Sequence, residues 1–139
     1  MIINSSIRKY EVVFDKSIFD SLSKEIVPDS IIFIDQKVYD LLDKNSKKII
    51  DKNKHLLIEA NEHQKSYSQI RPLIESVIKY NFRKNNKLIC IGGGITQDIT
   101  AFISSIIFRG VEWIFFPTTL LSQADSCIGG KTSINIGKY

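Results

Sequence analysis

The feature that most constrains the fold is an alternation of short apolar runs with segments of helical periodicity. Residues 31–34 and 88–91 are compact runs rich in β-branched side chains, which is typical of strands buried on both faces of a parallel sheet. In the segment 67–83 between them, apolar residues recur at helical spacing, which predicts a helix. This order favours an α/β fold, a Rossmann-like and mostly parallel sheet with helices on both faces.

The other expected elements continue the alternation. We expect further strands at 10–14, 55–58 and 111–116, and helices at 18–26, from residue 38 onward and at 99–108. The chain has 139 residues, of which 43% are hydrophobic and 24% charged, so it suits one soluble domain with an ordinary core. We therefore expect a single folded unit over residues 1–139.

Composition excludes several classes of protein. The net charge of +4 comes from dispersed lysines without a basic, aromatic-rich stripe, so we expect no nucleic-acid partner. Cys90 and Cys127 make no disulfide framework, and Cys90 lies in an apolar run typical of the core. Cysteines and histidines show no metal-ligand spacing, so we predict no metal ligands. Without a signal peptide or an apolar stretch of about 20 residues, we expect no membrane association and a cytoplasmic location.

Three glycines break the run 88–91. Gly92, Gly93 and Gly94 precede a helical segment that contains Asp98. Glycines let backbone N–H groups approach a ligand closely, and a helix N-terminus favours anions, so a pyrophosphate fits this turn. We expect Asp98 in the first helical turn, where it would also reach a cofactor hydroxyl. The triplet is not the Gly-x-Gly-x-x-Gly motif, and a plain strand-to-helix turn is the alternative interpretation.

A second polar segment follows the last expected strand. Thr118 and Thr119 come just beyond its carboxyl end, where open α/β sheets bind ligands. Asp125, Lys131 and Asn135 follow among small residues and glycines. This density of donors and acceptors indicates a binding site, and the alternative is a capping turn with a solvated lysine.

These motifs together resemble the 3-dehydroquinate synthase family. The run RGVEWIFFPTTLLSQAD from Arg109 to Asp125 resembles the family's core signature, and SCIGGKT continues it to Thr132. The resemblance is close over residues 88–135. It implies a Rossmann-like N-terminal domain that binds NAD.

Upstream the resemblance is looser but in the same order. Asp35 with Val38 resembles the family's Asp-x-Asn-Val turn, and Glu62 with Lys65 resembles its Glu-x-x-Lys pair. Lys37 stands where the family usually has Asn, so the sequence departs from the family pattern at this adenosine contact.

The resemblance implies a role for each matching residue. For NAD it implies Asp35, Glu62 and Lys65 at the adenosine, Gly93, Gly94 and Asp98 at the pyrophosphate and nicotinamide ribose, and Thr118 and Thr119 at the nicotinamide end. Asp125 and Lys131 match residues that contact both NAD and substrate, and we expect them to be catalytic.

Two further residues are expected at the substrate. Arg109 matches an arginine that reaches the substrate phosphate across a homodimer interface, and the alternative is a cation at a helix C-terminus. We also place Asn135 among the substrate-binding residues. Thr96 and Gln97 replace the small residues usual before Asp98, which indicates a divergent branch.

The implied reaction is the NAD-dependent cyclisation of a phosphorylated seven-carbon sugar with phosphate elimination, of the shikimate pathway type. The family's divalent metal, zinc or cobalt, is held by a C-terminal helical domain that is absent up to Tyr139. We therefore expect residues 1–139 to be the NAD-binding domain and to be inactive alone. The alternatives are a sedoheptulose 7-phosphate cyclase, a polyol dehydrogenase-like enzyme and a non-catalytic NAD-binding module.

Overall fold

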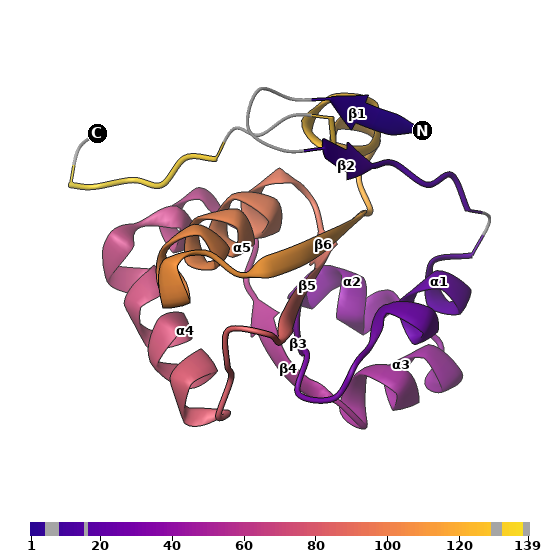
Figure 1. Ribbon diagram of the computed structural model, residues 1–139, viewed down its shortest axis with the longest axis horizontal. Helices are drawn as coiled ribbons and strands as arrows, with labels where there is room; N and C mark the ends of the chain where they lie inside the picture. Colours follow the sequence, from indigo (N-terminus) through magenta and orange to yellow (C-terminus); the bar gives the residue numbers. More distant parts are fainter. Residues whose placement is uncertain (5–8, 16, 129–131, 138–139) are drawn as a thin grey trace.

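A four-stranded parallel sheet in the order β4-β3-β5-β6 forms the centre of the molecule (Figure 1). The computed structural model describes residues 1–4, 9–15, 17–128 and 132–137. The strands are β3 (Ile31–Asp35), β4 (Lys54–Ile58), β5 (Lys87–Gly92) and β6 (Glu112–Pro117). This confirms the expected α/β architecture, and the strand bounds agree with the predicted runs to within one residue.

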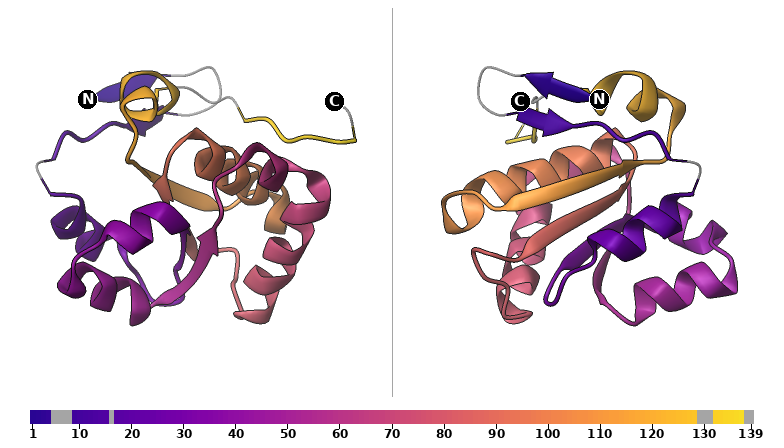
Figure 2. Two further views of the ribbon diagram at one scale, coloured as in Figure 1. Left: turned by 180° about the vertical axis from the view of Figure 1, so that it is seen from behind. Right: turned by 45° about the vertical axis from the view of Figure 1, so that its right-hand side comes forward.

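Helices cover both faces of the sheet, as Figure 2 shows. They are α1 (Ile18–Glu25), α2 (Gln36–Leu41), α3 (Lys44–Asp51), α4 (Tyr67–Lys79) and α5 (Gly94–Ile106), with short helical turns η1 (Glu62–Lys65), η2 (Ile107–Arg109) and η3 (Ser122–Ser126). Aspartates are the N-caps of two helices. The side chain of Asp35 at α2 and that of Asp43 at α3 accept hydrogen bonds from backbone N–H groups of the first helical turn.

Two apolar clusters pack these layers together. Alternate residues of β3 point to opposite faces, so Ile31 and Phe33 pack with α4 and α5, while Ile32 and Ile34 pack with α1 and α3. Each such side chain is fully buried, which stabilises the fold by about 1.5–3 kcal/mol per residue. The continuous apolar run of β3 is explained by burial on both faces.

The strand order creates a switch point between β3 and β5. From β3 the chain crosses to β4 through α2 and α3, whereas from β5 it crosses to β6 through α5 on the other face. Loops at the carboxyl ends of β3 and β5 therefore diverge, and open α/β sheets bind ligands in the crevice this leaves.

The N-terminal strand prediction is wrong in its bounds. Residues 9–11 form β2 (Lys9–Glu11), which pairs with β1 (Ile2–Asn4) in an antiparallel hairpin separate from the main sheet. The pairing ends at Val12, whose backbone N–H donates to the carbonyl of Met1 at 2.8 Å, and Phe14, expected at the end of this strand, is 83% exposed. The hairpin lies beside η3 in both views of Figure 2.

Helix α5 begins five residues earlier than the predicted helix at 99–108, because Gly93 is its N-cap and Gly94 is already helical. Asp98 is therefore the fifth residue of α5 and not in its first turn, contrary to expectation. The expected helix from residue 38 is two helices, α2 and α3, since Asp43 starts a new one.

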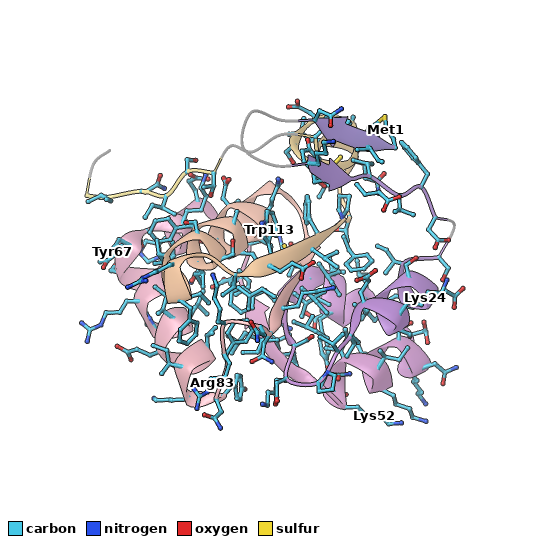
Figure 3. All side chains as sticks on the ribbon, in the orientation of Figure 1. Met1, Lys24, Lys52, Tyr67, Arg83 and Trp113 are labelled. Atoms are coloured by element: carbon cyan, nitrogen blue, oxygen red, sulfur yellow. The ribbon has the colours of Figure 1, made fainter. Side chains whose placement is uncertain are left out.

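Charged side chains are dispersed over the molecular surface. In Figure 3, Lys24, Lys52 and Arg83 project from separate places on the periphery. Among the helices of the described chain, none is long and apolar enough to cross a membrane.

Candidate functional site

Two loops meet at the carboxyl ends of β5 and β6. The backbone N–H of Thr118 donates to the carbonyl of Gly92 at 2.9 Å. A Cβ placed on Gly93 would lie 3.0 Å from Cγ2 of Thr119. The glycine turn and the threonine loop are therefore in direct contact, at the edge of the sheet where ligands bind.

Space, and not backbone conformation, explains the glycines of the turn. A Cβ on buried Gly92 would lie 2.7 Å from Oγ1 of Thr96 and 3.3 Å from Cβ of Asp35. Gly93 has φ −96°, which other residues also adopt. A Cβ on Gly94 would have no neighbour within 4 Å, so the start of α5 faces open space.

The N-terminus of α5 is suited to an anion. Its N-cap, Gly93, provides no side-chain hydrogen bond, and the first helical bond runs from Gln97 N to Gly93 O. Within the described part of the chain, the first N–H groups of the helix thus have no side-chain cap, and the positive end of the helix dipole lies beside the exposed Gly94. A phosphate group fits this arrangement.

The two threonines differ in what their hydroxyls do. Oγ1 of Thr119 donates to Oγ of Ser122 at 2.8 Å, within a turn in which Ser122 is 1% exposed. Oγ1 of Thr118 is buried and has no hydrogen-bond partner in the described part of the chain. A buried hydroxyl without a partner is costly, so Thr118 is suited to bind a ligand group.

A buried glutamine of α5 forms two hydrogen bonds with η3. Nε2 of Gln97 donates to the carbonyl of Ser126 at 2.7 Å, and Oγ of Ser126 donates to Oε1 of Gln97 at 2.6 Å. Sequence reasoning missed this contact, although its signal was present: Gln97 is one of the two departures from the small residues expected before Asp98. Asp125, in the same turn, is exposed.

Lys65 is the centre of an ionic cluster. Its Nζ lies 2.9 Å from Oδ2 of Asp98 and 3.4 Å from Oε1 of Glu62, and it donates to Oγ of Ser133 at 3.2 Å. Burial disfavours the charged lysine, but the hydrogen bond and charge of Asp98, aided by Glu62, outweigh it and raise the pKa of Lys65. The structure therefore brings together three residues expected at the cofactor, namely Glu62, Lys65 and Asp98.

Asn135 joins the cluster from the other end of the sequence. Its Nδ2 donates to the carbonyl of Glu62 at 3.2 Å and to Oε1 of Glu62 at 3.1 Å. The hydrogen bond from Asn135 to the Glu62 carboxylate is the main cause of the lowered pKa of Glu62. Desolvation opposes this effect by raising the pKa, and the charge of Lys65 lowers it further. Asn135 thus stabilises the ionised Glu62.

The remaining expected residues are placed differently. Asp35 is buried at the end of β3 and accepts a hydrogen bond from the backbone N–H of Lys37 at 2.9 Å. Arg109 is exposed and precedes β6. It therefore lies at the amino end of the parallel strands, whereas the glycine turn lies at their carboxyl end. Lys131 lies outside the described residues.

No group of three or more His, Cys, Asp or Glu side chains within residues 1–4, 9–15, 17–128 and 132–137 is placed to hold a metal ion. The polar groups described above are hydrogen-bond donors, hydrogen-bond acceptors and a helix N-terminus, and a helix N-terminus is suited to a phosphate group.

Comparison with known proteins identifies related chains. The family model described as 3-dehydroquinate synthase N-terminal matches residues 55–139. A 3-dehydroquinate synthase of Pelagibacter ubique (strain HTCC1062) is 33% identical over 141 residues, covering 96% of this chain and 38% of the relative. The chain therefore spans about two-fifths of the length of such relatives.

Two solved structures share the fold. One is 2-deoxy-scyllo-inosose synthase complexed with carbaglucose-6-phosphate, NAD+ and Co2+, with a TM-score of 0.80, 23% identity and coverage of 97% of this chain and 39% of that one. The other is 2-epi-5-epi-valiolone synthase from Streptomyces hygroscopicus subsp. jinggangensis 5008 with NAD+ and Zn2+ bound, with a TM-score of 0.69, 21% identity and coverage of 91% and 38%.

Proposed function

Because the chain belongs to the 3-dehydroquinate synthase family, whose N-terminal model it matches over residues 55–139, we propose that it is the nucleotide-binding portion of a 3-dehydroquinate synthase-like enzyme. The proposed reaction is a carbon–oxygen lyase reaction, in which a phosphorylated seven-carbon sugar loses phosphate and closes into a carbocycle. The curated relatives are named 3-dehydroquinate synthases, which supports this reaction over that of a sedoheptulose 7-phosphate cyclase.

The residues present fit NAD. The contact between Gly93 and Thr119 carries the assignment, because it joins a helix start suited to an anion to a loop in which the buried Thr118 hydroxyl has no hydrogen-bond partner among the described residues. The backbone N–H groups at Gly93 and Gly94 would bind the pyrophosphate, and the hydroxyl of Thr118 would bind near the nicotinamide with Thr119 shaping the wall. Two structures of the same fold contain NAD+.

The ionic cluster would bind the rest of the cofactor. Glu62 and Lys65, together with Asp35 at the end of β3, would face the adenosine. Asp98 would contact the nicotinamide ribose while it holds Lys65 at 2.9 Å. A carboxylate that accepts hydrogen bonds from sugar hydroxyls and a cation near phosphate are complementary to this ligand.

Bound NAD supplies a reversible hydride acceptor, and a ketone beside the leaving phosphate makes the neighbouring proton removable. The chain's own contribution is to orient the substrate. Asp125 on η3 would accept a substrate hydroxyl, and Lys131 would stabilise negative charge that develops on the oxidised carbon's oxygen. Arg109 would bind the substrate phosphate of a partner protomer in a homodimer.

A divalent metal, zinc or cobalt, would complete the site in a longer protein. Structures of the same fold contain Co2+ or Zn2+. Such an ion polarises a substrate hydroxyl, and its ligands would come from outside residues 1–139.

Calorimetric titration of the 139-residue chain with NAD+ tests the proposal. We expect saturable binding of one NAD+ per chain, weakened about tenfold by Thr118→Val, because the substitution keeps the shape and removes the ligand's hydrogen-bond partner. Thr100→Val is the matched control, since the hydroxyl of Thr100 bonds within α5 to the carbonyl of Thr96 at 2.7 Å. Absence of heat at millimolar NAD+ would disprove cofactor binding.

A further inference from the structure

The segment from Thr132 to Gly137 lies beside η1 and the first turns of α5, although it is distant from both in sequence (Figure 1). The backbone N–H of Asn135 donates to the carbonyl of Lys65, and the N–H of Tyr67 donates to the carbonyl of Asn135, each at 2.9 Å. Asn135 and Ser66 thus form a parallel β-bridge. The bridge fixes the backbone of Asn135 without help from its side chain.

The side chain of Asn135 is therefore free to act on Glu62. Its amide donates both to the carbonyl and to Oε1 of the same residue, at 3.2 and 3.1 Å. Two bonds to one residue fix the direction of the amide and the rotamer of the glutamate together. The Glu62 side chain is nevertheless 66% exposed.

Glu62 is consequently fixed at one oxygen only. Its Oε1 receives Asn135 and faces Lys65 Nζ at 3.4 Å, whereas its Oε2 has no hydrogen-bond partner among the residues described. The ammonium of Lys65 uses its three hydrogens on Glu62, Asp98 and Ser133. A pre-oriented carboxylate with one open oxygen accepts a hydrogen bond from a hydroxyl.

We propose that Asn135 is a positioning residue for the adenosine ribose, which holds Glu62 so that Oε2 accepts a ribose hydroxyl. The proposal rests on the proposed function and replaces the expectation that Asn135 contacts the substrate. Fixing the rotamer before binding removes an ordering cost that the ligand would otherwise bear. Asn135 itself does not touch the cofactor.

The test measures discrimination between two ligands that differ only in the ribose hydroxyls. Calorimetry gives the affinity of the 139-residue chain for ADP and for 2′,3′-dideoxy-ADP. We expect the unmodified chain to prefer ADP about tenfold, since a hydrogen bond to a charged group is worth about that factor. Asn135→Ala should reduce this preference towards one, and Asn45→Ala, on the exposed surface of α3, should leave it unchanged.

A double-mutant cycle separates positioning from a general structural role. Glu62→Ala by itself should abolish the preference for ADP, and adding Asn135→Ala should cause no further loss, because both changes act on the same hydroxyl contact. Loss of folding would instead weaken the binding of both nucleotides equally and leave the ratio of their affinities unchanged. An unchanged ratio in Asn135→Ala, or no preference in the unmodified chain, would overturn the proposal. Binding of neither nucleotide nor NAD+ would overturn the proposed function as well.

Discussion

At the scale of the residue, three consecutive glycines have different surroundings. Gly92 has no room for a side chain because of Thr96 and Asp35, and Gly93 has little room because of Thr119. Gly94 has free space around it and needs no glycine for the fold. Under the proposed function, the free space at Gly94 would let the pyrophosphate of NAD approach the backbone closely.

Gly94→Ala separates folding from binding. The added methyl group meets no protein atom, and alanine favours the helix over glycine, so the melting temperature should stay the same or rise. The methyl group would occupy the place of the pyrophosphate, and NAD+ affinity should fall at least tenfold, an expectation that thermal unfolding and calorimetry check together. Gly93→Ala is the comparison, because its methyl group contacts Thr119 and should also lower the melting temperature.

Sequence reasoning could identify the residues but not their partners. The polar groups Glu62, Lys65 and Asp98 were expected at one cofactor, and the structure joins them in one cluster. The placement of Asn135 could not be predicted, because its contact with Glu62 spans 73 residues of sequence. No local pattern encodes so distant a partner.

At the scale of the element, α5 organises the site. It begins within the glycine turn at Gly94, its Gln97 side chain donates a hydrogen bond to η3, and the carbonyl of Asp98 accepts a hydrogen bond from Thr132 at 2.8 Å. Strands β3 and β5 were predictable because their compact apolar runs are buried on both faces. The start of α5 was not, because it depends on which glycine becomes the N-cap.

The pair of Gln97 and Ser126 should behave as one unit. Gln97→Met keeps the size of the side chain and leaves a carbonyl without its donor, so we expect it to destabilise the protein by about 1–3 kcal/mol in chemical denaturation. Ser126→Ala should cost a similar amount, and the double variant clearly less than the sum. Gln69→Met on α4 is the control. Additive effects would show that the two side chains do not interact.

At the scale of the whole molecule, Cys90 is a reporter of unfolding. It lies fully buried in β5 at the centre of the sheet, and burial raises the pKa of its thiol to about 12. A thiol reacts as the thiolate, so Cys90 should be inert in the native state, whereas the partly exposed Cys127 should react.

Labelling with a thiol-specific disulfide reagent should therefore show two phases. Cys127 reacts first, and Cys90 reacts at the rate at which the sheet opens, with both reacting at once in denaturant. In Cys127→Ser only the slow phase should remain, and saturating NAD+ should slow it further by stabilising the folded state. Rapid reaction of Cys90 in the native chain would show that the core of the sheet opens readily.

The bridge between Ser66 and Asn135 has a consequence for the order of assembly. A growing polypeptide leaves the ribosome from its amino end, so the last strand of the sheet, which ends at Pro117, emerges before Asn135 does. Contacts between residues far apart in sequence also carry the larger loop-closure entropy. During synthesis the sheet can thus form while Glu62 still lacks its partner, and the proposed adenosine-binding part of the site is completed last.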